Sequence, residues 1–286
     1  MIFAKIKTEK AKKELLLIPL LFFLFKLFLL GKEKVWLHNI SALAYLLIIF
    51  IISGCSKDQP EEMTVAAAAN LQSVFTEIGR RFSEETGHKV TFSFSSSGNL
   101  AQQIINGAPF DIFASADTSY VDKLEAQGLL LPNSKQIYAQ GQIVLAVNQK
   151  SGLKVTQLDD LLNPQVRKIA IANPEHAPYG EAAMQALQKR GLWEQLQPKI
   201  VYGENVLQAL QFIKTGNAEA GIVPLSIATV EEITYTIVDA SLHEPINQAM
   251  AIIKTTKHQA VAKAVTKFVN SSQGRVILEQ YGYKVP

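Results

Sequence analysis

Several features that mark common classes of protein are scarce or absent in this sequence. Only one of the 286 residues is a cysteine, Cys55, so no disulfide forms within the chain and no Cys-x-x-Cys motif is present. The sequence also lacks a Walker A loop, a Gly-x-Ser-x-Gly motif and a His-Glu-x-x-His motif. A hydrolase is therefore an unsupported alternative, and we expect a protein that is not an enzyme and has no cofactor.

Positive charge is also scarce outside the N-terminal region. Residues 1–54 contain 8 lysines, no arginine and 3 glutamates, a net charge of +5. The remaining residues contain 20 Lys and Arg against 22 Asp and Glu, a net charge of −2 within a chain whose total is +3. Binding to a nucleic-acid backbone needs clustered Lys and Arg. We therefore expect no nucleic-acid partner, and 48% hydrophobic residues favour a globular body.

The N-terminal region contains two apolar runs. Leu15 to Leu30 is apolar except for Lys26 and Pro19, and is short for a membrane span. Asn39 to Ser56 has no charged residue and follows two lysines, as the apolar part of a signal peptide does. We interpret residues 1–54 as a leader. Because it is longer than usual, either translation starts further downstream or the first run is an accessory anchor.

The second run ends at Ile-Ser-Gly-Cys, residues 52–55. This motif resembles the bacterial lipobox, in which the cysteine is lipidated and becomes the new N-terminus. The polar residues 55–62 that follow are expected to be a tether. The alternative is an ordinary Cys55 thiol beside a transmembrane helix. The position of Cys55 at the end of the apolar run favours lipidation and a location on the outer side of the cytoplasmic membrane.

From Met63 onward, short apolar segments alternate with stretches whose apolar residues recur every three or four positions. The first kind is typical of strands and the second of amphipathic helices, so the alternation predicts an α/β fold. We expect strands at Thr64–Ala69, Val90–Phe94, Asp111–Ala114, Ile143–Val147, Ile169–Ala172, Ile200–Val201, Ala220–Val223, Thr236–Val238 and Ala249–Ile253.

The strands and helices form two series, which predict two lobes with a ligand cleft between them. Residues 63–142 and 246–286 are expected in lobe 1 and residues 143–245 in lobe 2. No Pro-, Gly- or Ser-rich linker separates the two series. We therefore expect strands near Tyr138–Asn148 and Val238–Ile253 to cross between the lobes as a hinge.

Four junctions between a predicted strand and a predicted helix are candidates for an anion site: Asn70, Ser97, Tyr179 and Val206. Helix N-termini carry partial positive charge, and in open α/β sheets they lie beside the binding crevice. Residues 64–79, 91–122 and 169–188 contain no Lys or Arg, so neutral donors would hold the anion. The alternative roles are N-caps for Asn70 and Ser97, a cleft-lining aromatic for Tyr179 and a core residue for Val206.

Seven motifs together resemble one family. They are AAAANL (66–71), FSSSGNLA (94–101), GAPFDIFASAD (107–117), NPEHAPYG (173–180), ENV (204–206), AGIV (220–223) and YGY (281–283). From Met63 to Tyr283 the chain is similar to the molybdate-binding component of bacterial ABC importers.

The resemblance implies a two-lobed periplasmic-binding-protein fold, type II-like, that binds molybdate or tungstate. It implies delivery of the oxyanion to a membrane permease driven by an ATPase, by a protein expected to be a monomer. The family's oxyanion contacts fall on Asn70, Ser97, Tyr179 and Val206. Many members have Ser where this chain has Asn70, which still supplies a donor. Some use a Tyr hydroxyl where this chain has Pro224, so that contact is absent.

A metal-ion or other small-oxyanion binding protein is the alternative function. Glu175, His176, Tyr179 and Glu181 offer oxygen and nitrogen ligands in one segment. No second ligand cluster accompanies them, which favours the alternative that His176 is a loop histidine bonded to the backbone. We therefore expect no metal site.

Overall fold

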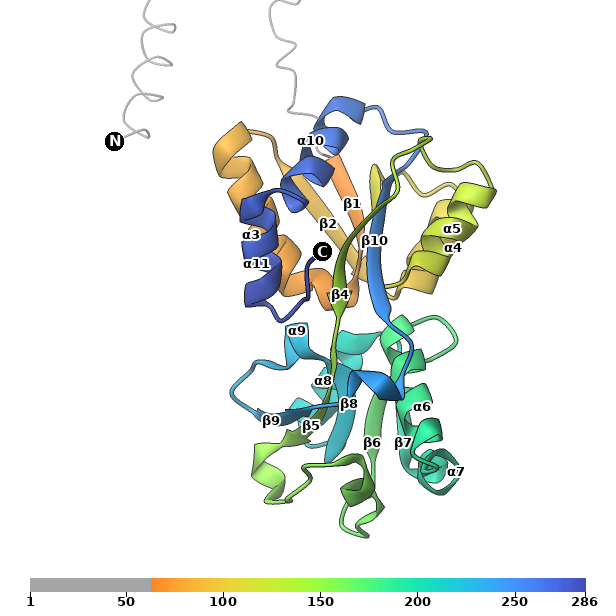
Figure 1. Ribbon diagram of the computed structural model, residues 1–286, viewed down its shortest axis with the longest axis vertical. Coiled ribbons are helices and arrows are strands. Elements are labelled where there is room, and N and C mark those ends of the chain that lie inside the picture. Colours follow the sequence, from red (N-terminus) through yellow and green to blue (C-terminus); the bar gives the residue numbers. More distant parts are fainter. Residues whose placement is uncertain (1–62) are drawn as a thin grey trace, which may run out of the picture. The chain divides into compact units, whose positions relative to one another are not determined.

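The computed structural model describes residues 63–286, so the predicted leader, the tether and Cys55 lie outside the described residues. The described part contains two five-stranded sheets, each flanked by helices (Figure 1). This is the two-lobed α/β fold that the sequence predicted. Within residues 63–286 no helix combines the length and hydrophobicity needed to cross a membrane.

The first sheet has the strand order β2-β1-β3-β10-β4. Its first three strands are parallel, and β10 is antiparallel to both of its neighbours. The strands are β1 (Met63–Ala68), β2 (Val90–Ser95), β3 (Ile112–Ser115), β4 (Gln136–Gly141) and β10 (Ile246–Ile252).

Helices cover both faces of the first sheet (Figure 1). α3, α10 and α11 lie on one side and α4 and α5 on the other. Their bounds are η1 (Ala69–Leu71), α3 (Gln72–Thr86), α4 (Ser97–Ile105), α5 (Thr118–Ala126), α10 (Gln259–Val269) and α11 (Ser272–Gln280).

The second sheet has the strand order β7-β6-β8-β5-β9, with β6 parallel to both neighbours and β5 antiparallel to both of its own. The strands are β5 (Ile143–Asn148), β6 (Ile169–Ala172), β7 (Ile200–Gly203), β8 (Ala220–Pro224) and β9 (Ile233–Ile237). The helices are η2 (Gln149–Ser151), η3 (Leu158–Leu162), α6 (Pro178–Lys189), α7 (Trp193–Leu196), η4 (Gln197–Lys199), α8 (Val206–Lys214), α9 (Leu225–Ala228) and η5 (Ala240–Leu242).

Two segments connect the sheets. The first is nearly one continuous strand, because only Gln142 separates β4 from β5. The second runs from β9 to β10 through residues 238–245, which contain the short helix η5. The predicted second crossing is therefore a loop that leads into a strand rather than a strand throughout. β10 also begins three residues earlier than predicted, at Ile246.

The larger cluster of buried apolar side chains contains residues of both sheets, whereas a second cluster joins residues of the first sheet to α4 and α5. The larger cluster includes Val65 and Tyr138 of the first sheet and Ile143 and Ile171 of the second. Strands covered on both faces by helices have nearly continuous apolar runs, as β5 has from Ile143 to Val147, with all six of its residues buried. Burial of this kind gives the sheets their rigidity and places the ends of the strands, where the helices begin.

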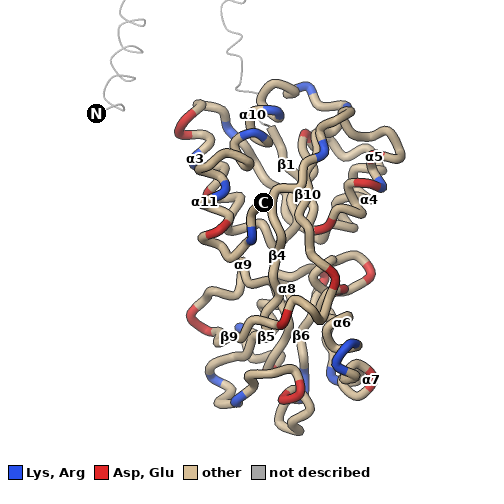
Figure 2. Tube along the Cα trace, viewed as in Figure 1, with Lys and Arg blue, Asp and Glu red and all other residues tan. Residues whose placement is uncertain are grey.

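Lys and Arg residues lie among Asp and Glu along much of the described trace, and several Lys and Arg residues lie close together near α10 (Figure 2). On helix α3, for example, Arg80 forms ion pairs with Glu77 and Glu84.

Candidate functional site

The four candidate residues lie where strands end and helices begin. β1 and β2 are parallel neighbours in the first sheet, and β6 and β7 are parallel neighbours in the second. Parallel strands end at the same edge of a sheet, so the helix N-termini that follow these four strands are paired, two in each lobe.

One small uncharged cavity lies between these helix N-termini. The space in it that is open to a water-sized sphere is about 10 Å³. It is lined by residues of both lobes: Ala68, Ala69, Asn70, Ser96, Ser97, Ala116, Ala177, Pro178, Tyr179, Asn205 and Val206. All four candidate residues are in this set, and none of the lining residues has an ionisable acidic or basic side chain other than the phenol of Tyr179.

At the start of α4 the cap is Ser96, one residue before the candidate Ser97. Ser96 Oγ accepts a hydrogen bond from Asn99 N, and Gly98 N donates to the carbonyl oxygen of His176. Ser97 Oγ accepts from Ala116 N at 3.0 Å, which leaves the Ser97 hydroxyl hydrogen for another acceptor. The main-chain N–H of Ser97 has no acceptor within the helix, as at any first helical position.

At the start of α6 the first residue is Pro178, which has no N–H. The N–H groups of Gly180 and Glu181 both donate to the carbonyl oxygen of Ala177. The N–H of Tyr179 is therefore the group of this first turn that remains for a ligand.

At the start of α8 the cap is Asn205. Its Oδ1 accepts hydrogen bonds from Leu207 N at 2.9 Å and Gln208 N at 3.2 Å. The cap satisfies these two donors and leaves the N–H of Val206, which precedes them.

Three helices thus each offer one main-chain N–H at the wall of the same cavity, from Ser97, Tyr179 and Val206. Each helix N-terminus carries roughly half a positive charge from the aligned peptide dipoles. Three of them, with the Ser97 hydroxyl, offset much of the charge of a buried dianion without an ion pair. The arrangement is suited to a small group that accepts hydrogen bonds from several directions.

Asn70 is not an N-cap, contrary to the alternative considered from the sequence. It lies within η1, and α3 begins after Leu71 with no side-chain cap. Asn70 Nδ2 donates to Gln248 Oε1 at 2.9 Å and to the Tyr283 hydroxyl at 2.7 Å. Both amide hydrogens are used within the protein, so the side-chain donor that we expected from Asn70 is not available to a ligand in this arrangement.

The contacts of Gln248 fix the orientation of the Asn70 amide. Gln248 Nε2 faces three acceptors, the carbonyl oxygens of Ala116 and Ile246 and the hydroxyl of Tyr179. Its Oε1 therefore faces Asn70, which must present Nδ2. Asn70 belongs to the cavity wall and at the same time to a buried polar network beneath it.

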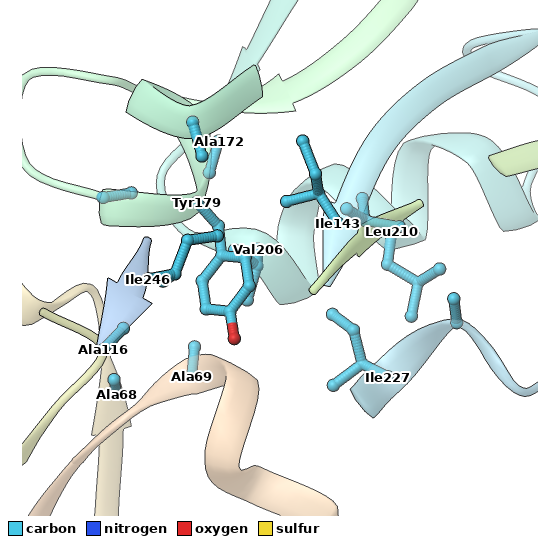
Figure 3. Close-up of a cluster of buried hydrophobic side chains, with 14 of the residues drawn as sticks. Ala68, Ala69, Ala116, Ile143, Ala172, Tyr179, Val206, Leu210, Ile227 and Ile246 are labelled. Atoms are coloured by element: carbon cyan, nitrogen blue, oxygen red, sulfur yellow. The ribbon is translucent and has the colours of Figure 1, made fainter. Parts of the chain in front are cut away.

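The side chain of Tyr179 points away from its own helix toward the segment that carries Ala69 (Figure 3). Its hydroxyl lies 3.4 Å from Gln248 Nε2. A Cβ atom on Gly141 would lie only 1.9 Å from this hydroxyl oxygen, so the crossing strand needs glycine here. Burial, with neighbouring Tyr283, raises the pKa of Tyr179 well above its usual range, and the phenol stays neutral.

Further hydrogen bonds join the two lobes at the rim of the cavity. His176 Nδ1 lies 3.0 Å from Ser96 Oγ, and Asn99 Nδ2 donates to Glu204 Oε1 at 3.0 Å. His176 thus bonds a side-chain hydroxyl, not the backbone that we had considered for it. Within residues 63–286 no group of three or more His, Cys, Asp or Glu side chains is arranged to hold a metal ion.

Sequence reasoning missed the residues beneath the cavity: Gln248, Tyr283 and Ser226. Ser226, two residues after Pro224, contacts Asn70 from the second lobe: its Oγ donates to the Asn70 carbonyl oxygen at 3.0 Å. Gln248 could have been noticed as a polar residue within the apolar segment of β10. Tyr283 lies in the YGY motif, whose role the sequence left open.

Comparison with known proteins agrees with this architecture. Residues 63–284 match the family model described as bacterial extracellular solute-binding protein. The chain belongs to that family.

Three relatives have the following names and extents of similarity. The molybdate-binding protein ModA of Rhodobacter capsulatus is 39% identical over 223 residues, 78% of this chain and 88% of the relative. YvgL of Bacillus subtilis, named as an ABC transporter substrate-binding lipoprotein, is 32% identical over 252 residues, 84% of this chain and 96% of its own. The solved periplasmic molybdate-binding protein of Azotobacter vinelandii has a TM-score of 0.74 at 35% identity and covers 78% of this chain and 99% of its own.

Proposed function

We propose that this solute-binding protein captures molybdate or tungstate in the cavity between its lobes and delivers it to an ABC importer. The observation that carries the proposal is the convergence of three otherwise unpaired N–H groups, from Ser97, Tyr179 and Val206, on one small uncharged cavity. The relatives named for molybdate add support, since the alignment with each covers 78% of this chain.

The chemistry of the wall favours a fully ionised tetrahedral oxyanion. Every donor that we assign to the ligand is a neutral N–H or O–H group, so a ligand that keeps its own acidic proton would bring a donor where acceptors are needed. Size is the second criterion, because a rigid cage built on helix N-termini fits one ion radius best. We propose Asn70 as a wall residue that contributes through its main chain, and the other three as hydrogen-bond donors.

The predicted N-terminal segments fit delivery at a membrane. We propose that residues 1–54 are a leader removed at a lipobox, that Cys55 is lipidated, and that residues 55–62 tether the protein to the outer side of the cytoplasmic membrane. The lipoprotein name of the Bacillus relative supports this anchor. The partners are then a permease and its ATPase, and the protein acts as a monomer.

We further propose the division of the body into lobe 1, residues 63–142 with 246–286, and lobe 2, residues 143–245. Binding with release, rather than catalysis, is the proposed role. The relatives, which are named as binding proteins, support it.

Calorimetric titration of the purified full chain in detergent tests the proposal. Molybdate and tungstate are each expected to bind, whereas sulfate and phosphate are expected to bind at least a hundredfold more weakly. A ligand at 1,000 times its dissociation constant should raise the free energy of unfolding by about 4 kcal/mol.

Equal affinity for sulfate would contradict the proposed specificity. Stabilisation by Fe(III) or Zn(II) alone, with none by an oxyanion, would instead favour a metal-ion binding protein.

A further inference from the structure

The C-terminal tail, residues 281–286, is hydrogen-bonded to the first crossing strand close to the hinge. Gln140 N donates to the Lys284 carbonyl oxygen at 2.7 Å, and Lys284 N donates back to Gln140 at 2.9 Å. Gln142 Nε2 donates to the Gly282 carbonyl oxygen at 2.8 Å. These bonds flank Gly141, the residue against which the Tyr179 hydroxyl packs. The tail therefore holds Tyr283, which lies between the bonded residues, in a fixed position at the hinge.

The Tyr283 hydroxyl contacts both lobes. It accepts a hydrogen bond from Asn70 Nδ2 at 2.7 Å and lies 3.1 Å from both the Asn70 carbonyl oxygen and Ser226 Oγ. Asn70 follows β1 of the first sheet, and Ser226 lies on α9, which packs on the second. One hydroxyl thus touches a residue of the cavity wall and a residue of the opposite lobe.

The number of available protons shows how the three groups depend on one another. Ser226 Oγ has one proton and donates it to the Asn70 carbonyl oxygen at 3.0 Å. The Tyr283 hydroxyl accepts from Asn70 Nδ2, and its single proton faces both Ser226 Oγ and the Asn70 carbonyl oxygen. Asn70, Ser226 and Tyr283 are all buried. Opening the lobes would break the hydrogen bonds that join Ser226 to Asn70 and Tyr283, and Asn70 and Tyr283 could not replace these bonds with each other.

We propose that Tyr283 is a positioning residue for oxyanion binding, whose hydroxyl joins Asn70 to Ser226 and holds the two lobes closed around the ligand. The pairing of the tail with β4 fixes the hydroxyl in place. This inference rests on the proposed function, because it concerns the release of the same oxyanion. By holding the lobes together, the tail slows that release.

A second buried tyrosine supplies a matched control. Tyr138 lies on β4 and is 1% exposed, compared with 4% for Tyr283. Its hydroxyl has no hydrogen-bond partner among the described residues. Replacing either tyrosine with phenylalanine removes one buried oxygen and leaves the ring, but only at Tyr283 does the change remove contacts between the lobes.

The test compares the full chain with Tyr283→Phe, Tyr138→Phe, Ser226→Ala and the Tyr283→Phe/Ser226→Ala double variant, in detergent. Molybdate affinity and dissociation rate are measured for each. Tyr283→Phe is expected to weaken binding about tenfold, chiefly through faster dissociation, as the loss of a buried hydrogen bond does. The double variant should lose less than the product of the single effects, since both remove the same junction. Tyr138→Phe should bind like the unmodified chain.

A second measurement follows closure without relying on affinity. Spin labels at Glu125→Cys on α5 and Gln188→Cys on α6, in a Cys55→Ser background, report the distance between the lobes with and without molybdate. With Tyr283→Phe, a larger fraction of molecules should show the longer, open distance. Unchanged affinity and unchanged distances for Tyr283→Phe would overturn the inference, even if its melting temperature falls.

The two proposals fail in different ways. If the unmodified chain binds neither molybdate nor tungstate, the proposed function is wrong, and the distances measured without ligand then decide the role of Tyr283. If it binds them and Tyr283→Phe matches it in dissociation rate, only the role of Tyr283 is wrong.

Discussion

The carbonyl oxygen of Asn70 accepts a hydrogen bond from the hydroxyl of Ser226 at 3.0 Å, and the two residues belong to different lobes. Asn70 also forms part of the cavity wall. Asn70 therefore belongs both to the wall of the site and to a contact between the lobes. Variants of the site should accordingly be judged by both ligand affinity and ligand-free stability.

The first prediction concerns Ser97. Ser97→Ala should weaken molybdate binding about tenfold, because the hydroxyl hydrogen is lost from the cavity wall. Ligand-free stability should also fall, by about 1–3 kcal/mol, because the buried N–H of Ala116 loses its acceptor, Ser97 Oγ. Ser96→Ala is the matched control: it should lower ligand-free stability by about 1 kcal/mol, as the loss of an N-cap does. Titration calorimetry and urea unfolding measure the two effects. A cap-sized loss of stability for Ser97→Ala with unchanged affinity would contradict its role as a donor.

The second prediction concerns Gly98, whose N–H donates to the carbonyl oxygen of His176 in the other lobe at 2.9 Å. A Cβ atom there would lie 2.7 Å from His176 Cβ in the second lobe, closer than two carbon atoms pack. Gly98→Ala should therefore hinder closure and weaken oxyanion binding severalfold. Ligand-free stability should not fall, because alanine favours helix by roughly 1 kcal/mol over glycine.

Gln102→Ala, at an exposed position of the same helix, is the control for helix propensity. The spin-label distances described above, measured with saturating molybdate, should lengthen for Gly98→Ala and stay unchanged for Gln102→Ala. Normal closure in both would show that His176 moves aside at little cost.

The third prediction concerns alkaline pH. Burial raises the pKa of Tyr283 to about 12, whereas an unfolded tyrosine has a pKa of about 10. Between these values the unfolded chain has released the proton and the folded chain retains it, so the free energy of unfolding falls as pH rises. The contribution is complete below pH 10 and is lost as pH passes through about 12. Urea midpoints from pH 8 to 12 should fall less steeply for Tyr283→Phe, and equal slopes would contradict the assignment.

The fourth prediction concerns the anchor. Cys55→Ser should release the protein from membranes into the soluble fraction, because the lipid attachment site is lost. Fractionation of cells with an antibody against the protein measures the distribution. The full-length Ser56→Ala variant keeps the cysteine and should remain in the membrane fraction. If Cys55→Ser also remains there, the apolar leader holds the protein instead.

Much of the architecture was predictable because its signals are local. The segment Ile143–Val147 is apolar throughout, and β5 occupies it and one further residue. The helix after Asn205 follows from apolar residues at a spacing of three and four, and its N-cap lies directly before Val206. Predictions at the junctions between strands and helices were less accurate. Asparagine is a residue type that often caps helices, but Asn70 lies inside a short helix. Its amide is occupied by partners 178 and 213 residues away in the sequence.

By itself, the sequence determined the α/β fold, the pairing of strand ends with helix starts and the absence of basic residues near them, because each depends on neighbouring residues and their periodicity. Only the tertiary structure decided which donors remain for a ligand. Caps and turns supply acceptors for most N–H groups at a helix start. Which N–H group is left depends also on the acceptors that the opposite lobe places there. The same holds for Tyr283, whose hydroxyl acquires its role from Asn70 and Ser226, residues that folding alone brings together.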